Sequence, residues 1–150
     1  MRNPGLNRQV VEDSVQYFRD GLYCSEAILK AFNEHYQLGL SDQFLKIATG
    51  FGAGLGGSKC SCGSLTGGVM VLSLVFGRTN PDESEQAAFD TVSALHTDFK
   101  DEFKATCCRV LTRNVTWGEP EHHEYCEIFV RRAAEKTNAI LQARLQSNVG

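Results

Sequence analysis

The chain has 150 residues, a length that suits one domain, and its 42% hydrophobic content is enough to fill a single core. The formal net charge of −3 comes from dispersed charges, without the cluster of Lys and Arg that nucleic acids and anionic membranes attract, so neither partner is expected. The sequence shows neither an apolar signal region nor an apolar run long enough to insert into a membrane, so we expect a cytoplasmic protein.

Apolar residues recur at helical spacing in the first third of the chain. A stripe predicts a first helix that ends at Gly21, and it consists of Val10, Val11, Val15 and Phe18. A second helix should begin near Ser25, whose hydroxyl can cap it, and this places Cys24 at its N-terminus. Ser41 can likewise cap a short third helix, which a glycine run ends. The residues expected to be buried or carried by these two helices are Ala27, Ile28, Ala31, Phe32, His35, Phe44, Leu45 and Ala48.

Two further helices are predicted in the middle of the chain. The fourth begins just after Cys62 and continues to Gly77, and because it is apolar on all sides it should be the central and most buried element. Residues 80–83 (Asn-Pro-Asp-Glu) predict the start of a long fifth helix, since they supply a capping residue, a proline at the first helical position and two acids. The apolar stripe of that helix is Ala88, Val92, Leu95, Phe99 and Phe103.

The last predicted helix runs from about Glu121 into the 140s, with Cys126 in its second turn. A short turn or helical piece over 109–114 and a loop over 117–120 precede it. No alternation typical of strands competes with these patterns. The predicted fold is one all-α domain over 1–150, a bundle of five to six helices around a central apolar helix that follows a Gly-rich loop.

The six cysteines are the main functional signal, because a protein of a reducing compartment keeps its thiols free for metal or redox chemistry. Cys24 and Cys62 fall at predicted helix N-termini, where backbone N–H groups and the helix dipole stabilise a thiolate. Cys108 follows the fifth helix, and Cys126 faces inward from the last. Four sulfurs that converge from four segments would form a four-thiolate site.

The chain resembles the family of redox-active proteins named C_GCAxxG_C_C for an isolated cysteine, a Cys-Gly-Ala-x-x-Gly motif after a glycine-rich run, and two later cysteines. The first cysteine is Cys24 in Tyr-Cys-Ser-Glu-Ala, and the motif corresponds to 62–67 (Cys-Gly-Ser-Leu-Thr-Gly), with Ser64 in place of the usual alanine. The third cysteine corresponds to Cys108, with Cys107 as the alternative, and the fourth to Cys126. Cys60 is an extra cysteine that could also contact the site.

This resemblance implies a redox role for the chain. A similar domain accompanies haem in split-Soret-type cytochromes, and iron–sulfur ligation is the implied chemistry. The resemblance thus indicates a [2Fe–2S] or [4Fe–4S] cluster on Cys24, Cys62, Cys108 and Cys126, used for electron transfer or redox sensing. Covalent haem is not expected, because the chain has no Cys-x-x-Cys-His.

Two other functions remain open on the sequence. A thiol–disulfide protein would cycle Cys107 with Cys108, or Cys60 with Cys62. A structural zinc protein would use the same four sulfurs as the cluster, but separations of 38, 46 and 18 positions (24 to 62 to 108 to 126) differ from the short-spaced pairs usual for zinc. The sequence does not identify the redox partner protein, and it leaves a homodimer possible. It also does not decide whether the protein is an oxidoreductase or an electron-transfer component.

The glycine run and His122 are weaker indications of function than the cysteines. The glycine run over 50–57 is expected to let backbone approach the sulfurs. Its Gly-x-Gly-x-x-Gly spacing is nominally a dinucleotide motif, but a helix and not a strand is predicted before it. His122 is four positions before Cys126 and could bind metal or a sulfur, although a solvated helix start is the favoured interpretation.

Overall fold

The computed structural model describes residues 4–147, and across this range it contains helices and no β-strand. A single isolated antiparallel bridge joins Ser61 and Cys107. The predicted all-α class is therefore confirmed. The helices are α1 (Pro4–Arg19), α2 (Cys24–Tyr36), α3 (Asp42–Leu45), the 3-10 helix η1 (Lys46–Phe51), α4 (Gly52–Leu55), α5 (Gly63–Phe76), α6 (Gln86–Phe103), α7 (Cys108–Leu111) and α8 (Pro120–Ser147).

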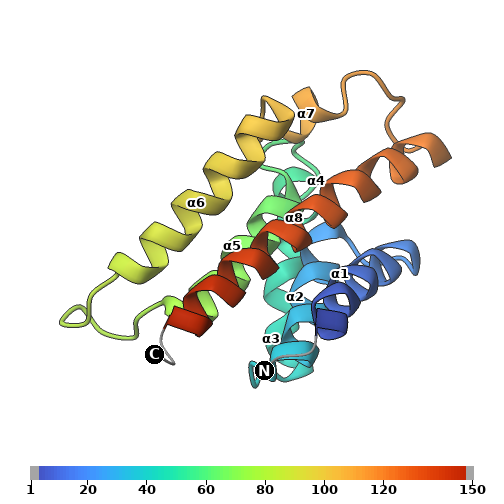
Figure 1. Cartoon of the computed structure of the whole chain (residues 1–150). Coiled ribbons are helices and arrows are strands. Elements are labelled where there is room, and N and C mark those ends of the chain that lie inside the picture. The colour runs from blue at the N-terminus through green and yellow to red at the C-terminus, as the bar shows by residue number, and fades with distance from the viewer. Residues whose placement is uncertain (1–3, 148–150) are drawn as a thin grey trace.

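The long helix α8 crosses α5, with α6 on one side and α1 and α2 on the other (Figure 1). The short helix α7 lies at the end of α6, before the loop that leads to α8 (Figure 1). The predicted apolar stripe of α1 is buried, because its four residues are each at most 6% exposed. The largest side chains that are fully buried come from α1, α2, α5, α6 and α8 and include Phe32, Leu72, Phe99 and Leu141. The core thus lies where these five helices meet.

Helix α5 has the predicted ends, but it is not buried on all sides. Val71 and Leu72 are completely buried, whereas Leu74 is 44% exposed. Helices α2, α6 and α8 cover three sides of α5. The remaining side borders an apolar groove that also contains the exposed Phe44 and Ile47. The expectation of a wholly buried central helix is therefore wrong for one face, because the short η1 region does not cover it.

Two helix starts differ from the sequence expectation. The hydroxyl of Ser25 does not cap α2 but donates to the carbonyl oxygen of Ala48 at 2.8 Å, which ties α2 to η1. Helix α6 begins at Gln86 and not after Asn80. The side-chain oxygen of Asn80 accepts the N–H of Asp82 at 3.0 Å, so the residues that resemble a helix start form a turn instead.

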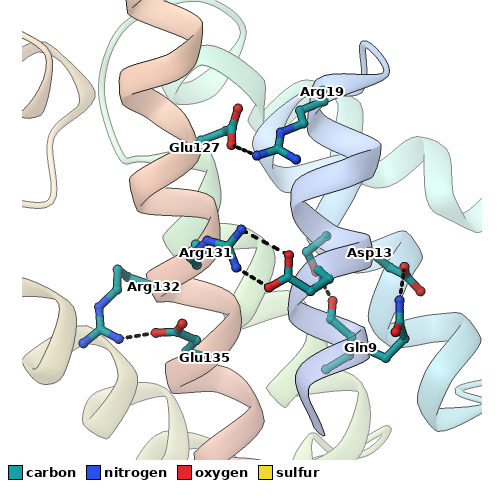
Figure 2. A network of polar contacts seen from close by, with 10 residues as sticks. Gln9, Asp13, Arg19, Glu127, Arg131, Arg132 and Glu135 are labelled. Carbon is teal, nitrogen blue, oxygen red and sulfur yellow. Dashed lines mark hydrogen bonds and ion pairs between the residues drawn. The ribbon is translucent and has the colours of Figure 1, made fainter. Parts of the chain in front are cut away.

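Ion pairs connect α8 with α1 on the surface (Figure 2). The Arg19 guanidinium contacts Glu127 at 2.7 Å, and the Arg131 guanidinium donates to Glu12. Exposed pairs of this kind contribute about 0–1 kcal/mol each, so the apolar core and not these pairs holds the helices together. The pairs help to fix the position of α8 along α1. Within the described residues, none of the helices is long and apolar enough to cross a membrane.

Candidate functional site

Four of the six cysteines line one cavity of about 380 Å³, and these are Cys24, Cys62, Cys108 and Cys126. They come from the first residue of α2, the residue before α5, the first residue of α7 and the second turn of α8. Cys60 and Cys107 do not line the cavity. Cys60 is exposed, and the thiol of Cys107 donates to the carbonyl oxygen of Lys59 at 3.2 Å. The four sulfurs selected from the sequence therefore share one site, while their role as ligands stays a prediction.

A short backbone pairing holds two of these cysteines in place. The N–H of Cys62 donates to the carbonyl oxygen of Thr106 at 2.8 Å, and the N–H of Cys108 donates to that of Cys60 at 2.5 Å. The N–H of Arg109 donates to Lys59 at 3.0 Å and extends the pairing. The segment before α5 is thus connected directly to the segment before α7. This contact joins positions more than forty residues apart, and no local pattern in the sequence predicts it.

Glycine allows the starts of α2 and α5 to approach each other. A Cβ atom at Gly63 would overlap the Cys24 sulfur and come within 3.1 Å of the Phe51 carbonyl oxygen. One turn later, a Cβ atom at Gly67 would lie 3.2 Å from the backbone of Ser25. A Cβ atom at Gly67 would require α2 to shift by a few tenths of an ångström, whereas one at Gly63 would displace the Cys24 sulfur. Gly67 therefore serves tight helix packing, and Gly63 leaves space for the sulfur.

The glycine-rich run folds back on itself beside the cavity. Gly54 has a φ of +71°, and a Cβ atom there would lie 2.8 Å from the Lys59 carbonyl carbon. The N–H of Lys59 donates to the carbonyl oxygen of Ala53 at 3.1 Å and closes the turn. Ala53 consequently lines the cavity, so backbone does approach the sulfurs as the sequence predicted. The segment before this run is η1 and not the strand that a dinucleotide site requires.

The pKa values of all four cavity thiols are raised, and burial is the largest cause in each case. The pKa of Cys108 rises to about 11 and that of Cys126 to about 12, because each also faces the charge of neighbouring sulfurs. Backbone N–H groups of Ser25 and Ala53 oppose the rise at Cys24 without cancelling it. The expectation that helix N-termini would favour thiolates here is therefore wrong for the metal-free protein, because desolvation outweighs the helix ends.

These raised pKa values predict that the reduced, metal-free protein loses stability in alkali. An unfolded thiol has a pKa of about 8.5, so above that pH the unfolded chain releases protons that the folded chain retains. The stabilisation is complete below pH 8.5 and is lost as the pH rises through the folded pKa values of about 11 and 12 at Cys108 and Cys126. Each such thiol changes the unfolding equilibrium constant by at most about tenfold per pH unit.

Urea unfolding at pH 7, 8.5 and 10 measures this loss. The midpoint should fall between pH 8.5 and 10, and Cys126→Ala should reduce that fall because one titrating thiol is gone. Cys60→Ser serves as the control, because Cys60 is exposed and outside the cavity. Equal slopes in wild type and Cys126→Ala would contradict the prediction.

His122 and Trp117 also line the cavity. On the sequence, His122 was a possible site residue for which a solvated helix start was favoured, and Trp117 was not identified as a site residue. The His122 and Trp117 rings lie 4.1 Å apart between centroids, and the Lys59 ammonium lies 4.5 Å from the Trp117 ring centre. Burial lowers the pKa of His122, and its Nε2 atom is buried without a hydrogen-bond partner. The expectation of a solvated helix start at His122 is therefore wrong. Its spacing of four from Cys126 was the available signal.

Lys59, and not the neighbouring Arg109, supplies positive charge near Cys108. Lys59 opposes the rise in the pKa of Cys108. Arg109 is exposed and does not line the cavity. The sequence placed Arg109 beside a cysteine, but the backbone pairing before α7 brings Lys59 there from the glycine-rich run.

The sulfurs share the cavity without closing around one point. Among residues 4–147, no three Cys, His, Asp or Glu side chains lie close enough together to hold a single metal ion. A tetrahedral zinc site requires four ligands at about 2.0–2.3 Å from one ion. As the cysteines stand, a zinc ion would therefore require the segments that carry them to move together.

Comparison with protein families identifies one match over most of the chain. The family model described as "Putative redox-active protein (C_GCAxxG_C_C)" matches residues 22–140. A comparison with curated proteins found no match, and neither did one with solved structures. The matched range contains all four cavity cysteines and every described element from α2 to most of α8. The chain belongs to the C_GCAxxG_C_C family of redox-active proteins.

Proposed function

We propose that this protein binds an iron–sulfur cluster through Cys24, Cys62, Cys108 and Cys126 and acts in electron transfer or redox sensing. The observation that carries the proposal is the shared cavity. Four cysteines from four separate elements line it, and the two remaining cysteines do not. If the cysteines were buried only as small apolar side chains, there would be no reason for these four to line one cavity while Cys107, the immediate neighbour of Cys108, does not.

The residues present fit such a group. Four thiols match the number of cysteines that hold a [2Fe–2S] or [4Fe–4S] cluster. The cavity of about 380 Å³ leaves room for more than one ion, since a water molecule occupies only about 30 Å³ of liquid. The separations of 38, 46 and 18 positions between these cysteines differ from the short-spaced pairs usual for zinc.

The chain contributes ligands, water exclusion and backbone dipoles. Because the pKa values of the four thiols are raised, the thiols of the metal-free protein hold protons that must leave when the sulfurs bind iron. Phe18, Leu111 and Phe129 line the cavity and keep water from the sulfurs. The N–H groups of Ser64 and Leu65 interact with the Cys62 sulfur and favour negative charge there. When bound, an iron–sulfur cluster supplies reversible one-electron chemistry.

The thiol–disulfide alternatives receive less support from the geometry. Consecutive Cα atoms are about 3.8 Å apart across a trans peptide, below the usual range of about 4.4–6.8 Å for a disulfide. The Cys107 thiol donates a hydrogen bond to the carbonyl oxygen of Lys59 while Cys108 lines the cavity, so the two thiols have different surroundings. Cys60 is exposed while Cys62 is buried, and forming a disulfide between them would remove Cys62 from the site.

Anaerobic reconstitution with iron and sulfide tests the proposal. The expected product has a broad visible band and matching iron and acid-labile sulfide. Dithionite should supply the electron that bleaches the band, and air should accept it and restore the band over several cycles with iron retained. Colourless protein that binds zinc would support the structural zinc alternative, and metal-free protein with a dithiothreitol-sensitive thiol count would support the thiol–disulfide alternative. Either result would overturn the proposal of an iron–sulfur cluster.

A further inference from the structure

Two buried polar atoms on the cavity wall lack a hydrogen-bond partner, namely Ser64 Oγ and His122 Nε2. Both residues line the same cavity as the four thiols. Buried donors in proteins are almost always paired, because an unpaired one has lost its hydrogen bonds to water without replacement. Two such atoms around one cavity indicate that the missing acceptor belongs to whatever occupies the cavity.

The local hydrogen bonds decide which nitrogen of His122 carries the proton. The backbone N–H of Gly118 donates to His122 Nδ1 at 3.3 Å, so Nδ1 is an acceptor. A neutral imidazole with an accepting Nδ1 carries its proton on Nε2. The unpartnered Nε2 is therefore an N–H donor. The Trp117 ring, 4.1 Å away between centroids, limits rotation of the imidazole away from this position.

The position of Ser64 at the start of α5 explains why its hydroxyl finds no carbonyl acceptor within the helix. A serine within a helix can donate to the carbonyl oxygen four residues earlier, but for Ser64 that residue lies before the helix. Thr66, two residues later, does donate to the carbonyl oxygens of Cys62 and Gly63 at 3.4 and 3.3 Å. Ser64 is 1% exposed, so its hydroxyl is shielded from bulk water. Its hydroxyl lies close enough to the Cys62 sulfur to interact with it.

We propose that Ser64 Oγ–H and His122 Nε2–H donate hydrogen bonds to the sulfur atoms of the cluster and raise its reduction potential. The inference rests on the proposed function, because it requires a sulfur-rich acceptor in the cavity. Hydrogen bonds to sulfur stabilise the more negative, reduced state and therefore favour reduction. The two donors come from α5 and α8, so they would contact the group from different sides of the site. Both are positioning residues that set the potential and do not ligate iron.

Potentiometric titration of reconstituted variants tests the pair. Ser64→Ala removes the hydroxyl, and His122→Phe removes the N–H while keeping an aromatic ring against Trp117. Each variant should shift the one-electron equilibrium about tenfold toward the oxidised state, which corresponds to a potential about 59 mV lower. His122→Gln keeps an amide donor and should recover most of the shift. Thr66→Ala is the control, because the hydroxyl it removes already has acceptors.

A second measurement does not depend on the cluster. In the metal-free protein, Ser64→Ala removes a buried hydroxyl without a partner, so the unfolding equilibrium constant should fall by about tenfold. The imidazole ¹⁵N shifts of His122 should report a proton on Nε2. Destabilisation by Ser64→Ala, or a proton on Nδ1, would show that the donors have partners in the protein and would overturn the inference.

The outcomes separate this inference from the proposed function. A wild-type protein that takes up no cluster overturns the proposed function, and the inference with it. If wild type and variants retain equal iron and have equal potentials, only the inference is wrong. If His122→Phe loses its iron, the reduction potentials of Ser64→Ala and His122→Gln decide whether the inference holds.

Discussion

Cys108→Ser is expected to lower the affinity for cluster iron by more than about 100-fold, because loss of a ligand costs more than the 10–100-fold typical of losing an outer hydrogen bond. Cys107→Ser is the matched control, one residue away, and should retain full iron. The two variants should differ because Cys108 lines the cavity, whereas the Cys107 thiol is hydrogen-bonded to the Lys59 carbonyl oxygen and does not line it. Iron and acid-labile sulfide per chain, with the visible spectrum, measure both.

The other cysteines extend the same test. Serine at Cys24, Cys62 or Cys126 should also cost the cluster, whereas Cys60→Ser should retain it because Cys60 is exposed and away from the cavity. Serine is close in size to cysteine, so the fold should survive each change, and helical circular dichroism verifies this. Full iron retention in Cys62→Ser, or equal losses in Cys107→Ser and Cys108→Ser, would contradict the ligand assignment.

Gly63→Ala is expected to abolish cluster binding while leaving the helices nearly unchanged. The new methyl group would overlap the Cys24 sulfur and come within 3.1 Å of the Phe51 carbonyl oxygen, so the sulfur must move out of its place. Overpacking of this kind typically costs about 1–3 kcal/mol, but alanine in a helix offsets about 0.5–1 kcal/mol of that relative to glycine. The protein should therefore remain folded, with the damage confined to the site.

Gly50→Ala is the matched control for this substitution. No atom lies within 4 Å of a Cβ built at Gly50, and its φ is not in the left-handed region. The control should retain both cluster and stability. Iron content and circular dichroism of the two variants distinguish a site defect from a folding defect. Normal iron binding in Gly63→Ala would mean that the Cys24 sulfur is not held against α5 as the structure places it.

Helical periodicity in the sequence was sufficient to predict the main elements. The apolar stripe of α1 is buried as expected, α5 begins after Cys62 and ends before Gly77, and α8 begins within one residue of the predicted start. These segments are long or strongly patterned, so local preference and tertiary packing favour the same structure. The start of α6 was predicted wrongly, because Asn80 and Pro81 suit a turn as well as a helix cap.

The sequence by itself also predicted the cysteines that line the cavity, since Cys24, Cys62, Cys126 and Cys108, with Cys107 as its alternative, were selected from spacing and family resemblance. Only the tertiary structure decided between Cys107 and Cys108, because the pairing before α7 directs consecutive side chains into different surroundings. It also decided the state of the thiols. Helix ends are visible in a sequence, but desolvation arises when α2, α5, α7 and α8 enclose the sulfurs, and it outweighs the helix ends. The buried Ser64 Oγ and His122 Nε2 atoms are recognised for the same reason only in the folded chain.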